Sequence, residues 1–122
     1  MQTMEKDPRL SLRLHFTQGL TFGRGKADLL RLIDEQGSIS AAGRAMNMSY
    51  RRAWALVVEM NLAFNQPLVD SSRGGAKGGG AALTDMGRQV LADYTALEDV
   101  LRDKGADPLE RMRRALKGYA PP

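Results

Sequence analysis

The chain has 122 residues, enough for one compact domain with tails but too few for two independent globular domains. Hydrophobic residues make up 43% of it and charged residues 26%, which excludes disordered, fibrous and membrane classes. It has no cysteine and one histidine, so disulfides, thiolate sites and histidine metal clusters are excluded. We expect no signal peptide, no membrane partner and a cytoplasmic location.

The formal net charge is +4, and the whole positive surplus lies before residue 84. Between Gln36 and Arg52 there are three arginines and no acidic residue. A local field of this sign favours a polyanionic partner such as nucleic acid, although a surplus of this size is also common in other proteins.

The first predicted element is a strand over residues 10–16, where leucine and phenylalanine alternate with polar residues. His15 falls on its polar side, which favours a solvated histidine over a catalytic one. A break over residues 19–25 follows. The apolar spacing of residues 26–36 then predicts a helix that Gly37 ends.

Two further helices follow closely. A short one is predicted over residues 41–46, with Ser38 and Ser40 as alternative N-caps and Asn47 as the turn residue. A longer one is predicted over about 49–65, capped by Ser49.

Short strands at residues 68–72 and 81–83 flank a loop over 73–80 that contains five glycines, which predicts a β-hairpin. A long helix then runs from Thr84 to about Lys104. The predicted fold is mainly α with a small β-hairpin: residues 1–104 form the domain, and 105–122 form a tail that we expect to be poorly ordered, with a basic turn or two after Pro108.

The spacing of residues 42–56 fits a helix-turn-helix. Such a pair of helices needs a small residue where they cross, apolar residues beside it, a turn former, and an apolar stripe on the second helix. The residues that fill these positions are, in chain order, Ala42, Gly43, Met46, Asn47, Met48, Ala53 and Leu56.

The first turn of the second helix of this pair holds the candidate DNA contacts. Arg51 and Arg52 are the candidate base readers, because arginine commonly binds guanine in the major groove. The alternative is that one or both only neutralise phosphates. Ser40, Ser49 and Tyr50 are candidate phosphate contacts. For Trp54 we favour packing over DNA contact.

The glycine-rich hairpin is a candidate wing. Arg73 and Lys77 stand among glycines that let the backbone approach DNA closely. For a hairpin in isolation, a surface loop with incidental charges would be the better interpretation. Its place after a helix-turn-helix favours a wing on the backbone or minor groove.

The sequence gives little support for other classes of functional site. Two glycine-lysine segments, at residues 23–26 and 74–78, lack the spacing and the hydroxyl residue of a phosphate-binding P-loop. No catalytic set or metal-spaced cluster stands out, so we expect neither an enzyme nor a cofactor.

At these same residues the sequence resembles the N-terminal DNA-binding domain of the ModE family of molybdate-responsive regulators, which is related to LysR-type winged helices. The resemblance covers about residues 25–101. It rests on GSISAA (37–42), MSYRRAW (48–54), EMN (59–61), GGAKGGGA (74–81) and LT (83–84).

The resemblance implies a winged helix-turn-helix with a long dimerisation helix, and a homodimer that binds double-stranded DNA at an inverted-repeat operator. Family members continue into a molybdate-binding region that we do not find after Gly105, so molybdate binding by this chain is doubtful. Two alternatives stay open: a winged-helix protein–protein interaction module, and a small molybdate or oxyanion-binding protein that uses the glycine loop.

Overall fold

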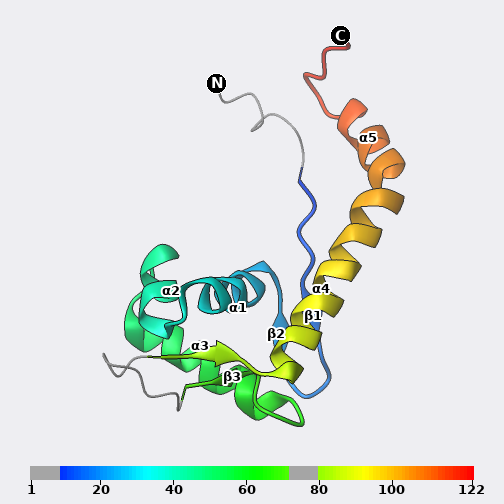
Figure 1. The fold of residues 1–122 in the computed structure, drawn as a ribbon. Helices are drawn as coiled ribbons and strands as arrows, with labels where there is room; N and C mark the ends of the chain where they lie inside the picture. The colour runs from blue at the N-terminus through cyan, green and yellow to red at the C-terminus, as the bar shows by residue number, and fades with distance from the viewer. Residues whose placement is uncertain (1–8, 72–79) are drawn as a thin grey trace.

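In the computed structural model, residues 9–71 and 80–122 are described. Figure 1 shows a body formed by helices and short strands, and a helical arm that leads away from it to the C-terminus. The elements are, in chain order, β1 (Leu14–His15), β2 (Thr21–Phe22), α1 (Arg24–Gln36), α2 (Ile39–Ala45), α3 (Tyr50–Ala63), β3 (Val69–Asp70), β4 (Ala82–Leu83), α4 (Asp85–Lys104) and α5 (Ala106–Arg114). The prediction of a mainly α fold with a small hairpin is confirmed.

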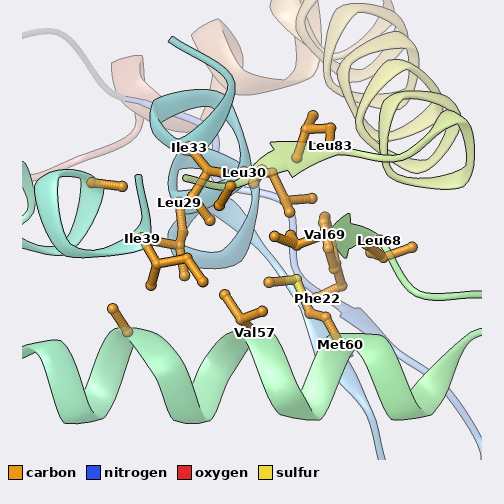
Figure 2. Close-up of a cluster of buried hydrophobic side chains, with 14 of the residues drawn as sticks. Phe22, Leu29, Leu30, Ile33, Ile39, Val57, Met60, Leu68, Val69 and Leu83 are labelled. Atoms are coloured by element: carbon orange, nitrogen blue, oxygen red, sulfur yellow. The ribbon is translucent and has the colours of Figure 1, made fainter. Parts of the chain in front are cut away.

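The core lies where α1 and α3 meet the two hairpins. Figure 2 shows Leu30 and Ile33 of α1 above Val57 and Met60 of α3, with Phe22 between α3 and the strands. All of these side chains are at most 1% exposed. Burial of each such side chain stabilises the fold by about 1.5–3 kcal/mol, so this cluster fixes α3 against α1.

The predicted strand over residues 10–16 is shorter in the structure. Only Leu14 and His15 pair, and their partners are Phe22 and Thr21 in an antiparallel hairpin whose second strand we did not predict. Gly19 makes the turn with a φ of 91°, a conformation that favours glycine. His15 is exposed, as its polar register predicted.

The arm consists of α4 and α5. Tyr94 anchors the arm to the body. Its hydroxyl donates a hydrogen bond to the Leu12 carbonyl oxygen at 2.6 Å, and its ring packs edge-on against the Phe22 ring, with the ring centroids 5.3 Å apart. Burial raises the pKa of the Tyr94 hydroxyl above its usual range, and the nearby Glu98 carboxylate adds to the shift.

The expectation of a poorly ordered tail was wrong for residues 106–114, which form α5. Pro108 lies in the first turn of this helix, where a missing N–H breaks no helical hydrogen bond, so the basic turns predicted after Pro108 belong to an ordered helix. The guanidinium groups of Arg113 and Arg114 donate hydrogen bonds to the Glu110 carboxylate, which lowers the pKa of Glu110 to about 2. Within the described ranges, no helix has both the length and the hydropathy needed to cross a membrane.

Candidate nucleic-acid interface

The joint between α2 and α3 is built around Gly43. A Cβ atom at this position would lie 3.0 Å from the Cβ of Ala53, closer than ordinary contact. The chain turns between the helices through Asn47, which has a φ of 60°, and the Met48 amide donates to the Gly43 carbonyl at 3.0 Å. The predicted crossing residue and turn residue of the helix-turn-helix are therefore confirmed.

Ser49 fixes the start of α3, because its hydroxyl oxygen accepts a hydrogen bond from the Arg52 amide at 3.1 Å. The Ser49 proton stays available for donation to a phosphate. The first turn projects from the body: Tyr50, Arg51 and Arg52 are all exposed.

The two arginines point in different directions. Successive helical residues are rotated by about 100°, and Ala53, Val57 and Met60 define the buried face of α3. Arg51 therefore lies on the outward face opposite the core. Arg52 lies on the flank that also carries Glu59, which pairs with Lys26 of α1 at 3.5 Å. Of the two candidate readers, Arg51 is the one that faces directly away from the body.

Ser38 is the N-cap of α2, and its hydroxyl accepts from the Ala41 amide at 3.0 Å. The alternative cap, Ser40, lies inside the helix and accepts from the Arg44 guanidinium at 2.9 Å. Ser40 is half-buried on α2. Because its oxygen accepts in the Arg44 contact, its hydroxyl proton could be donated to a phosphate.

The base of the second hairpin is fastened on both sides. The side-chain oxygen of Asn61 in α3 accepts from the amides of Leu68 and Val69 at 2.8 and 3.1 Å, and its side-chain NH₂ donates to the Val69 carbonyl at 3.1 Å. On the other side, the Ala81 amide donates to the Gly37 carbonyl at 2.9 Å. These contacts fix where the loop between the strands leaves the body.

Asn61 is a positioning residue to which the sequence assigned no role, although it lies in the EMN block (59–61) that carries the family resemblance. The indication of this role in the sequence is a polar amide close to the apolar stripe of α3, just before the helix ends. The two predicted wing contacts, Arg73 and Lys77, lie outside the described residues, so their roles remain predictions.

Trp54 is 39% exposed and therefore not a core residue. Its ring stacks on that of Tyr50, with centroids 6.3 Å apart and planes 19° apart. The pair borders a shallow hollow between α2, α3 and the hairpin base. The packing partner of Trp54 is thus another surface residue of the same helix turn.

Among residues 9–71 and 80–122, no group of histidine and acidic side chains is placed to hold a metal ion.

Comparison with characterised proteins gives three informative relatives. The DNA-binding transcriptional dual regulator ModE of Escherichia coli is 33% identical over 124 residues, which cover 96% of this chain and 47% of that protein. The molybdenum transport protein ModE of Azotobacter vinelandii is 44% identical over 70 residues, or 57% of this chain and 26% of that protein. These similarities support the assignment of this chain to the ModE family. The molybdenum-pterin-binding protein MopB of Rhodobacter capsulatus is 42% identical over 80 residues, or 66% of this chain and 30% of that protein.

The chain spans less than half the length of each of these ModE and Mop relatives. No family model matches the chain. The relatives are named as regulators, a transport protein and molybdenum-pterin-binding proteins, and none of the names describes an enzyme.

Proposed function

We propose that this chain is a ModE-type winged helix that binds double-stranded DNA in a sequence-specific manner and regulates transcription. In this proposal α3 is the recognition helix in the major groove, and residues 73–80 form the wing on the backbone or minor groove. Ser40, Ser49 and Tyr50 contact phosphates, with Arg73 and Lys77 as further backbone contacts.

One observation carries this proposal: the crossing of α2 and α3 at Gly43 leaves the first turn of α3 exposed, with Arg51 on its outward face. The arginine guanidinium matches the two acceptors of guanine in the major groove. The Asn61 contacts also place the hairpin base beside α3, where a wing would reach the adjoining DNA.

We further propose that the chain acts as a homodimer on an inverted repeat. The N-terminal segment covers part of α4 through the Tyr94 contact with Leu12. Leu97 and Val100 nevertheless stay 46% and 58% exposed, which leaves apolar surface for a second copy. A two-fold dimer would set its recognition helices about 34 Å apart, one turn of DNA.

Selection of bound duplexes from a random pool tests the proposal. We expect a palindromic consensus, because two-fold protein symmetry requires two equivalent half-sites. Arg51→Ala should relax the preference at one position per half-site, and a lost bidentate contact corresponds to about 1–3 kcal/mol of discrimination. Lys77→Ala should instead weaken binding to all sequences and reduce the salt slope by roughly one unit for each bound protomer.

Arg114→Ala is the matched control, because it removes an exposed arginine of α5 that pairs with Glu110 and lies on the arm. Equal affinity for selected and random duplexes would remove the claim of specificity. Failure to bind any duplex at low salt, with a co-purifying protein, would favour the interaction-module alternative.

We assign no molybdate site to this chain. The aligned part is 30% of MopB and 47% of the Escherichia coli regulator, so what those names say of the whole proteins does not transfer to it. Calorimetry with molybdate tests this directly, and a saturable heat of binding would reverse the assignment.

A further inference from the structure

An apolar row runs along one flank of α3. Tyr50, Trp54 and Val58 follow one another at intervals of four residues, and their side chains are 56%, 39% and 38% exposed. Residues four apart on a helix are neighbours on its surface, so the three form one strip. Asn61 continues on this flank and binds β3, so the strip borders the hairpin.

The aromatic end of the strip has a defined shape. Trp54 stacks nearly parallel on Tyr50, and the two rings line a hollow of about 170 Å³ together with Ser40, Ser71 and Gly80. At this centroid separation the two nearly parallel rings are offset, so each contacts an edge of the other. The rest of the Trp54 ring faces outward beside the first turns of α3.

Helical geometry places this surface beside the proposed groove contact. Trp54 lies three residues after Arg51, so their directions around the α3 axis differ by about 60°. A duplex that Arg51 approaches through its major groove therefore also meets Trp54. In that groove the base edges offer hydrogen-bonding groups, and the single apolar group among them is the C5 methyl of thymine.

We propose that Trp54, held by Tyr50, reads a thymine methyl group and so determines specificity at one position of each half-site. This inference rests on the proposed DNA binding and adds a second reader to Arg51. The polar residues beside the pair, Ser40 and Ser71, supply hydroxyl groups for the phosphate backbone that adjoins the same base.

The test uses the full chain and its selected duplex, with each thymine replaced in turn by deoxyuridine. This replacement removes only the methyl group and keeps every hydrogen bond of the base pair. Loss of one buried methyl-sized contact should weaken binding of the unchanged protein about fourfold at one position per half-site. Trp54→Ala should bind the thymine and deoxyuridine duplexes with equal affinity at that position.

Three variants separate base reading from a structural role. Trp54→Phe keeps an aromatic ring and should keep part of the discrimination. Leu62→Ala removes another exposed apolar side chain of α3, 81% exposed and two turns further along, and should leave the full discrimination in place. Arg51→Ala should lower affinity while preserving the ratio between thymine and deoxyuridine duplexes.

A second measurement reports on Trp54 itself, because it is the only tryptophan of the chain. Its fluorescence should change more on binding the thymine duplex than on binding the duplex with deoxyuridine at the sensitive position.

The proposal is overturned if the unchanged protein binds all the deoxyuridine duplexes as tightly as the thymine duplex. It is also overturned if Trp54→Ala retains the difference, because another residue would then read the methyl group. A chain that binds selected duplexes without methyl discrimination leaves the proposed function standing. A chain that binds no duplex removes both.

Discussion

Gly87 stands where the first turn of α4 meets the backbone of the second hairpin. A Cβ atom there would lie 2.1 Å from the Leu68 carbonyl oxygen, an overlap with main chain that no side-chain rotation relieves. That carbonyl also accepts a hydrogen bond from the Thr84 amide at 2.9 Å, so it is held in place. Position 87, in the first turn of α4, therefore tolerates only glycine.

We predict that Gly87→Ala lowers the free energy of unfolding by about 1–3 kcal/mol or more, because the helix and hairpin must move apart. Gly25→Ala is the control: it is exposed in the first turn of α1, with no neighbouring atom within 4 Å of an added Cβ. It should raise stability by up to about 1 kcal/mol. Urea denaturation of both variants measures this, and changes of the same sign would contradict the prediction.

Single residues also show what sequence reasoning could reach. The roles of Gly43, Asn47 and Ser49 follow from chemical properties that hold in any context, namely small size, tolerance of positive φ and capping by a hydroxyl. Trp54 could not be placed this way, because it lies at the edge of the buried stripe, where a small rotation of α3 decides between core and surface.

At the scale of elements, Asn61 joins α3 to the second hairpin by three hydrogen bonds. Because Leu68 and Val69 are buried, their amides have no water to replace this partner. Asn61→Ala should lower the free energy of unfolding by about 1–3 kcal/mol. It should also weaken duplex binding, because the proposed wing loses its fixed origin.

Asn65→Ala is the matched control, since Asn65 is exposed just beyond the end of α3. Thermal unfolding and duplex titration measure the two effects separately. A loss of stability with unchanged DNA affinity would show that the hairpin position is irrelevant to binding.

The elements that sequence predicted well are those with a long apolar period or a clear cap, such as α1, α3 and α4. The two-residue strand β2 was not predicted, because two residues carry no periodicity. The one indication of β2 in the sequence is the pair Leu20 and Phe22, which are both buried beside the Gly19 turn. Helix α5 was not predicted as an ordered helix because Gly105 is a typical helix stop. In the structure Gly105 has a φ of −89° and a ψ of −4°, a right-handed helical conformation that lets the chain continue into α5.

At the scale of the whole molecule, the exposed apolar residues of α4 predict association of two copies. Val100→Glu would place a charge in that surface and should convert the proposed dimer to a monomer without unfolding it, because the residue is 58% exposed. The affinity for a palindromic duplex should fall with it, since each half-site would be bound alone.

Ala92→Glu adds the same charge at another exposed position of α4, away from Val100 around the helix, and should leave the dimer intact. Sedimentation velocity at micromolar concentration distinguishes these cases. An unchanged protein that sediments as a monomer, or a Val100→Glu variant that stays dimeric, would contradict the proposed interface.

The arm has a further consequence for measurement. Its 20-residue helix α4 has a length of about 30 Å and is held to the body along much of that length, at Gly87 beside Leu68, at Tyr94 with Leu12, and at Thr95 and Glu98 with Arg31 of α1. Because α4 moves with the body, a rotation of both by about 10° displaces the far end of the helix by about 5 Å relative to its start. Labels near Lys104 would therefore amplify reorientations of the body that are too small to resolve at α3 itself.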